Sequence, residues 1–219
     1  MLLGGRAKAA PVAIAALADP SKWDSPLARL QFAAAAREAL RAGAVGPAVL
    51  TRAAALVAAD QQPDGRWKVD EELAAGSPVT YGSVLATFLA RGVLEMANAP
   101  HQYATAITRA TAWLSAREPK HVSELAVLVW ARNRPADRAK LLAAQLPKGS
   151  WNNEPFDTAL ALLALKGDNP KARAYLLEAQ FEPGGWPGTT RPAGGDSYAQ
   201  HISSTAWVVM ALMQEPGNH

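Results

Sequence analysis

The chain has 219 residues, 49% of them hydrophobic, which is enough for a globular domain with a sizeable core. Its net charge of +3 comes from scattered Arg and Lys residues without a basic block, so we expect no nucleic-acid partner. The absence of cysteine excludes disulfides, thiolate metal sites and a cysteine nucleophile, and no apolar run reaches the roughly 18 residues that span a bilayer.

The apolar residues are mostly Ala and Leu, and no run alternates with the period of two that is typical of strands, so the sequence predicts an all-α fold. The first predicted element is residues 7–18, an Ala-rich run that follows Arg6 and ends before Asp19. This pattern is that of a first helix or of a signal peptide cut at a small residue. The helix favours a cytoplasmic protein, whereas a signal peptide over residues 1–18 would make the protein secreted or periplasmic.

Nine further helices are predicted from apolar runs that Gly and Pro separate. Prolines after Ser25, Ser77 and Glu154 suit the first turn of a helix, where a missing N–H costs no hydrogen bond. The predicted ranges are 26–42, 47–60, 79–97, 102–117, 123–133, 136–145, 155–166, 170–180 and 200–214.

One spacing recurs three times between these helices: a Gln, three residues, a Gly, one residue and a Trp. The copies read QQPDGRW from Gln61 to Trp67, QLPKGSW from Gln145 to Trp151, and QFEPGGW from Gln180 to Trp186. Degenerate copies in the same register run from Leu17 to Trp23 and from Arg117 to Ser123. Such repetition indicates a repeat protein, here about five helix pairs in a single domain over residues 1–219.

Each residue of the motif is predicted to be structural. The Gln ends a helix, so its amide can donate to the orphan carbonyls of that helix and accept from the helix that follows the turn. The Gly permits a reversal with positive φ, and the Trp covers the turn and places its indole N–H near a carbonyl. These roles are assigned to Gln61, Trp67, Gln145, Trp151, Gln180 and Trp186.

With this repeat the chain resembles the terpenoid cyclase/prenyltransferase superfamily, and within it the squalene-hopene cyclase branch. The last copy is the most similar: its GGW, Gly184 to Trp186, and the helix SSTAWVVMAL, Ser203 to Leu212, resemble the GGW…SQTAWALMAL segment of that branch. The resemblance covers residues 47–214. It implies an α/α toroid with inner helices around a central cavity and outer helices around those. A complete toroid has six helix pairs, so five pairs imply a degenerate pair or an incomplete ring.

The catalytic residues of those families are not all present. The resemblance places the run from Glu154 to Ala159, EPFDTA, on the cyclase motif DxDDTA, whose central Asp protonates an alkene. Phe156 stands in the place of that Asp, and a phenyl ring cannot donate a proton. The prenyltransferase zinc motif is also incomplete, because Asp196 matches its Asp but Tyr198 stands in the place of its Cys. We therefore expect no metal and no cofactor.

A cluster of polar and aromatic residues remains at and beside the predicted starts of the inner helices. The candidate acid and base residues are Glu124, Asp157, Asp196 and His201. The candidate residues of a ligand cavity are Tyr81, Phe156 and Tyr198. Asp157 and His201 also have a structural interpretation, because an acidic first-turn residue is favoured by the helix dipole and His201 suits a cap or a packed ring.

Two functions from different classes fit these observations. The first is a non-catalytic binding or scaffold module, in which a toroid without its acid holds an isoprenoid, another lipid or a partner protein. The second is an enzyme, a terpene-like cyclase or a lyase, with relocated acid and base residues and the Gly-rich loop 184–195 as a lid. The chain also fits a subunit of a larger assembly, which a large exposed apolar patch would favour. We expect the first function.

Overall fold

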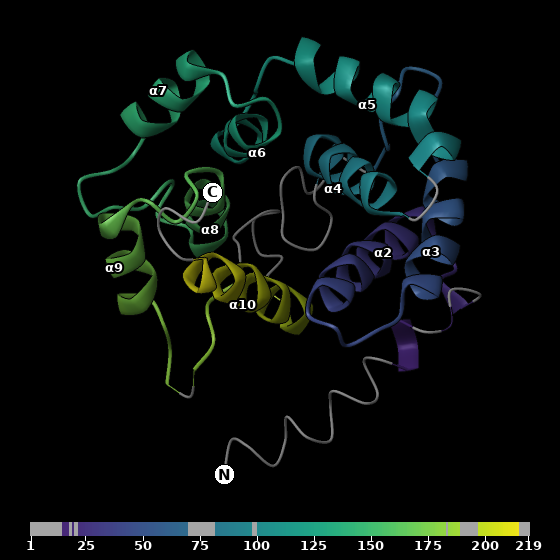
Figure 1. Cartoon of the computed structure of the whole chain (residues 1–219). Coiled ribbons are helices and arrows are strands. Elements are labelled where there is room, and N and C mark those ends of the chain that lie inside the picture. Colours follow the sequence, from purple (N-terminus) through teal and green to yellow (C-terminus); the bar gives the residue numbers. More distant parts are fainter. Residues whose placement is uncertain are drawn as a thin grey trace. The chain divides into compact units, whose positions relative to one another are not determined.

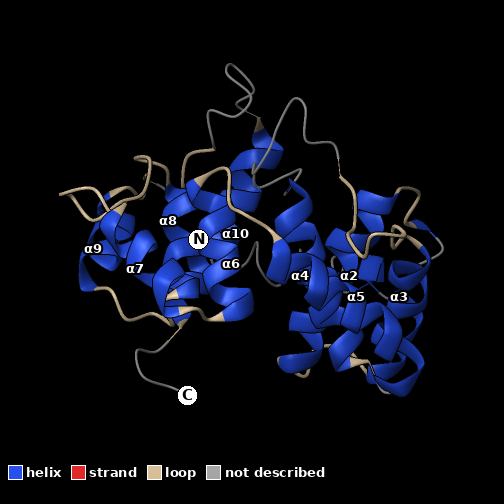
Figure 2. Ribbon diagram, turned by 90° about the horizontal axis from the view of Figure 1, so that it is seen from above, coloured by secondary structure: helices blue, strands red, loops and turns tan. Residues whose placement is uncertain are grey.

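The computed structural model describes residues 15–17, 19, 22–69, 82–97, 100–182, 184–188 and 197–214. Within them all regular elements are helices and no strand is present (Figure 2), which confirms the predicted all-α class. The elements are α2 (Pro26–Arg41), α3 (Pro47–Ala59), α4 (Gly82–Met96), the 3-10 helix η2 (Pro100–Tyr103), α5 (Ala104–Ala116), α6 (Val122–Arg132), α7 (Pro135–Ala143), α8 (Pro155–Ala164), α9 (Pro170–Glu178) and α10 (Tyr198–Met213).

The helix ends follow from capping residues in the sequence. Proline occupies the first turn of α2, α3, α7, α8 and α9, where its fixed φ suits the helix and its missing N–H has no intrahelical acceptor. The side chains of Ser25, Asn169 and Ser197 accept hydrogen bonds from the backbone N–H three residues on, at 3.1, 2.9 and 3.3 Å. These local signals explain why the predicted ranges agree with the observed ends to within a few residues.

Two compact units make up the chain. The first comprises Met1–Val69 and Ala86–Trp113, so it holds α2, α3 and most of α4 and α5. In this unit α2 packs against α3 through small side chains, among them the fully buried Ala33, Ala36 and Ala53, which let the two backbones approach closely. Trp23 stacks on Phe32 of α2 with 5.4 Å between the ring centroids.

The second unit comprises Asp70–Leu85 and Leu114–His219 and contains α6 to α10. Within this unit α8 packs against α6, α9 and α10, and α7 packs against α6 (Figure 1). All ten residues of α8 are buried, from Pro155 to Ala164, as is typical of a helix that is apolar on every side. Helix α8 is therefore the central element of this unit.

Some predictions about the architecture are confirmed only in part or stay untested. Most of the predicted helix 7–18 and the first residues of 79–97 lie outside the described residues. The predicted helix 102–117 is η2 followed by α5. No helix in the described part of the chain has both the length and the apolar character that crossing a membrane requires. A single toroid over residues 1–219 stays a prediction.

Candidate functional site

The three Gln-to-Trp segments adopt one and the same turn. In each, the N–H of the residue after Gln donates to the carbonyl of the residue before Trp, and the Gly N–H donates back to the carbonyl of the residue after Gln. The Gly φ angles are +96°, +94° and +104°, values that a residue with a side chain rarely adopts. The predicted reversal with positive φ is confirmed for Gly65, Gly149 and Gly184.

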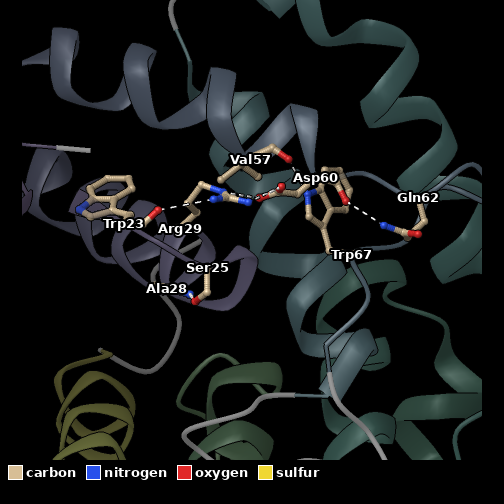
Figure 3. A network of polar contacts seen from close by, with 8 residues as sticks. All are labelled: Trp23, Ser25, Ala28, Arg29, Val57, Asp60, Gln62 and Trp67. Carbon is tan, nitrogen blue, oxygen red and sulfur yellow. Dashed lines mark hydrogen bonds and ion pairs between the residues drawn. The ribbon is translucent and has the colours of Figure 1, made fainter. Parts of the chain in front are cut away.

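The Trp of each turn is anchored to the helix that precedes it. Its indole N–H donates to the carbonyl of the residue ten positions earlier, which lies in α3, α7 or α9. The three bonds are Trp67 to Val57 at 2.7 Å (Figure 3), Trp151 to Leu141 at 2.8 Å and Trp186 to Leu176 at 2.6 Å. All three rings are at most 3% exposed. The predicted indole-to-carbonyl bond therefore occurs in every copy.

A threonine that the sequence analysis did not single out completes the motif. The backbone N–H of each Trp donates to a threonine hydroxyl in the helix that follows the turn, at 3.0 to 3.1 Å. The acceptors are Thr87 in α4, Thr158 in α8 and Thr205 in α10. The recurrence of Thr-Ala at 158–159 and 205–206 is a signal that could have found two of them. The third, Thr87, is followed by Phe88 and therefore lacks this signal.

The glutamine side chains bind a different helix from the one predicted. Gln61 Nε2 donates to the carbonyls of Gly65 at 2.9 Å and Ala106 at 2.8 Å, and its Oε1 accepts from Arg109 at 2.6 Å. Ala106 and Arg109 belong to α5, which is the second helix after the turn, not the first. The expectation that Gln61 binds α4 is therefore wrong.

Gln145 repeats this arrangement in the second unit. Its Nε2 donates to the carbonyl of Gly149 at 2.8 Å, and its amide exchanges two 3.1 Å bonds with Asn169, the N-cap residue of α9. The carbonyls at the ends of α3 and α7 are approached by backbone N–H groups of the same turn, which is why the Gln amides are available for a distant helix.

An ion pair joins the first turn to α2. Arg29 of α2 donates two 2.7 Å bonds to the carboxylate of Asp60, the residue that ends α3 (Figure 3). The Asp60 hydrogen bond is the main reason that the pKa of Arg29 is raised above its ordinary value. Arg29 also lies 3.5 Å from the carbonyl of Trp23, the Trp of the degenerate first copy. This ion pair ties the first turn to α2, whereas Gln61 ties the same turn to α5.

The degenerate copy at Arg117 uses an arginine from the following helix in place of the glutamine. Arg132 of α6 donates through Nη1 to the carbonyls of Leu114, Ser115 and Arg117, which close α5. Arg132 Nε binds Asp137 Oδ2 at 2.7 Å, with both side chains at most 8% exposed. A fixed positive charge thus satisfies the carbonyls at the end of α5, where no motif Gln is present.

Phe156 and Asp157, which the resemblance aligns with the cyclase motif, lie in the core of the second unit. Phe156 has no exposed surface and meets Trp207 of α10 edge to face, with 6.1 Å between centroids. Phe156 is therefore a core residue in this structure rather than a cavity-lining one, because a side chain that no water molecule can touch lines no open cavity. Asp157 is also fully buried, and its Oδ2 accepts from Asn152 Nδ2 at 2.7 Å. That bond holds the bend at Asn152 and Asn153, both of which have φ of 55°.

The other candidate residues take part in helix starts and turns. Glu124 accepts from the backbone N–H of Lys120 at 2.7 Å and lies 3.5 Å from Arg117. His201 Nδ1 lies 3.3 Å from the carbonyl of Trp186, so an Nδ1–H there donates to the turn. Tyr198 is 82% exposed at the start of α10. Tyr81 and Asp196 lie outside the described residues.

Glu124, Asp157 and His201 are therefore close to the starts of α6, α8 and α10, as predicted, but each has a structural partner. In the part of the chain that the structure describes, no group of three His, Asp or Glu side chains could hold a metal ion. Compared with the models of known protein families and with curated proteins, the chain matches none. The relationship to the terpenoid cyclases thus stays a prediction that rests on the repeat.

Proposed function

We propose that this protein is a non-catalytic binding module of the α/α-toroid class that binds a partner protein. Its Gln-to-Trp turns, called stapled turns because hydrogen bonds of the indole, the glutamine and the threonine tie them to neighbouring helices, make the helical scaffold rigid. The observation that carries the proposal is the burial of α8. The position of the cyclase acid is a fully buried phenyl ring, and the neighbouring carboxylate of Asp157 is fully buried and bound to Asn152. An acid that acts on a substrate must reach it, and neither side chain has surface to offer.

The packing of the second unit supports a protein partner over a lipid. An apolar ligand needs a preformed cavity lined by apolar side chains. All residues of α8 that would line it are buried, and among its Ala, Leu and Phe residues the most exposed are Leu163 and Ala164 at 6% each. The large apolar side chains that remain exposed lie instead on α7, α9, α10 and the last turn, which suits an external contact.

The helix arrangement supports the toroid class. In the second unit α6, α8 and α10 form one row, and α7 and α9 pack outside α6 and α8 (Figure 1). Two rows of alternating helices are what inner and outer layers of a toroid require.

Small-angle X-ray scattering tests the ring: a compact chain of this length has a radius of gyration of about 17 Å. A clearly larger value with a two-lobed distance distribution would contradict a single ring.

The non-catalytic proposal is tested with substrates of the cyclase class. We would incubate the purified chain with squalene and with a polyprenyl diphosphate, then analyse products by gas chromatography and bound lipid by native mass spectrometry. We expect neither product nor retained lipid. A product that forms with the wild type and not with Asp157→Asn would establish the enzyme alternative. Retained lipid without turnover would replace the protein partner by a lipid ligand.

A further inference from the structure

Two of the three turns serve as docking sites for the start of a helix. A Cβ at Gly65 would lie 2.5 Å from the carbonyl oxygen of Arg109, and one at Gly149 would lie 2.3 Å from that of Lys171. The backbones of α5 and α9 therefore rest directly on the two glycines. In both cases the residue over the glycine is basic, and the nearby Gln amide binds the same incoming helix or its N-cap residue.

The third turn has the same geometry but holds no helix among the described residues. Among the described residues, a Cβ at Gly184 would approach only Gln180 Nε2, at 3.7 Å. The Gln180 side chain is exposed, and within the described ranges it makes no hydrogen bond of the kind that Gln61 and Gln145 make. No helix follows α10 in the part of the chain that the structure describes. No described helix takes here the place that α5 and α9 take on the other turns.

Apolar side chains surround this third turn. Leu177, Phe181 and Ile202 are 60%, 43% and 54% exposed. Phe181 contacts the His201 ring, with 5.7 Å between centroids, and Ile202 is the next residue of α10. Single exposed apolar residues need no explanation, but three of them at one turn indicate an interaction surface. The exposed residues Glu178 and Glu182 stand on either side of Gln180 in the sequence and add negative charge.

We propose that the described residues of the third turn, Gln180–Glu182 and Gly184–Trp186, form with Leu177 and Ile202 a docking site for the first two turns of an α-helix of a partner protein. The two filled turns give the chemistry of that helix: an Arg or Lys whose backbone carbonyl rests on Gly184, and a backbone or side-chain group that binds the amide of Gln180. Glu178 and Glu182 favour the same basic residue. The proposal rests on the proposed function and names the class of partner.

The test uses the full chain and a synthetic peptide of residues 100–116, which carries the Ala106 and Arg109 contacts of α5. We would titrate the labelled peptide with the protein to about 1 mM by fluorescence anisotropy, the range in which weak single contacts are detected. We expect saturable binding to the wild type. The double variant Gln180→Ala, Phe181→Ser should weaken it about tenfold, which corresponds to about 1.4 kcal/mol. A peptide with Arg109→Glu should bind at least as weakly.

The control variant is Leu142→Ser. Leu142 is 42% exposed and stands three residues before Gln145, as Leu177 stands before Gln180, but its turn is already filled. The Leu142→Ser protein should bind the peptide as tightly as the wild type does. Gly184→Leu, which places a side chain where the helix would rest, gives a second loss variant, and circular dichroism shows whether each variant is folded.

Each other outcome counts against the proposal. Absence of wild-type binding, or binding that survives both loss variants, would overturn it. Concentration-dependent dimerisation in sedimentation velocity that the same substitutions abolish would assign the surface to a second copy instead of a different protein. Product formation in the squalene assay would refute the non-catalytic function without changing the peptide readout, so the two failures are distinguishable.

Discussion

The hydroxyl of Thr158 is the most direct test of the stapled turn. Substitution by valine keeps the shape and the β-branch but removes the acceptor for the buried N–H of Trp151, now at 3.1 Å. It also removes the 2.8 Å bond from Thr158 Oγ1 to the carbonyl of Glu154. That carbonyl keeps the backbone N–H of residue 158 at 3.0 Å, so the main loss is the unpaired N–H.

The magnitude follows from burial. A buried donor left without a partner costs about 1–3 kcal/mol, and Trp151 and Thr158 have no exposed surface. We therefore expect Thr158→Val to lower the free energy of unfolding by about 2 kcal/mol. For a chain of this length that corresponds to a Tm lower by about 4–8 °C. Thr205→Val should cost about half as much, because the N–H of Trp186 is only partly buried.

Urea unfolding followed by circular dichroism measures the loss, and hydrogen exchange of the Trp151 amide locates it. The matched control is Thr51→Val on α3, where the hydroxyl bonds the Pro47 carbonyl on the exposed surface, and we expect a change within about 0.5 kcal/mol. An equal, small effect of all three substitutions would refute the reasoning. So would an unchanged exchange rate at Trp151 in Thr158→Val.

Three further predictions concern other parts of the chain. Gly149→Ala should lower the free energy of unfolding by about 3 kcal/mol in denaturant titrations, because the new Cβ would lie 2.3 Å from a carbonyl oxygen at positive φ. Gly184→Ala should cost about 1 kcal/mol, because among the described residues its Cβ would meet only Gln180 Nε2, at 3.7 Å; equal costs would contradict the docking geometry. Arg132→Met should cost about 3–5 kcal/mol by the same measurement, since it leaves Asp137 buried without its partner, and a loss below about 1 kcal/mol would show that the pair is dispensable. Burial, and then the charge of Glu154, raise the pKa of Tyr175 above 10.0, so Tyr175 ionises at lower pH in the unfolded chain than in the folded one. The stability that is present below pH 10.0 should therefore be lost as the pH rises through the folded pKa. Thermal melts on both sides of that pH should show this loss in the wild type and not in Tyr175→Phe.

The sequence predicted the helices well because their limits are local. Proline in the first turn and Ser or Asn at the N-cap act within one turn of the chain, so their effect is visible without knowing the neighbours. The Gln-to-Trp spacing was equally readable, since both ends of the turn lie within seven residues and the indole bond reaches the preceding helix. The threonine of the staple was missed because its distance from the Trp varies from 7 to 20 residues between copies.

By itself the sequence determined an all-α repeat with a Trp-capped turn, since composition, punctuation and spacing are properties of neighbouring residues. Only the tertiary structure decided where each glutamine points and which carboxylates are accessible, because these depend on contacts such as the one between Gln61 and Ala106, 45 residues apart. The same holds for the turn at Gln180: its sequence matches the two filled copies, and only packing shows that none of the described helices rests on it.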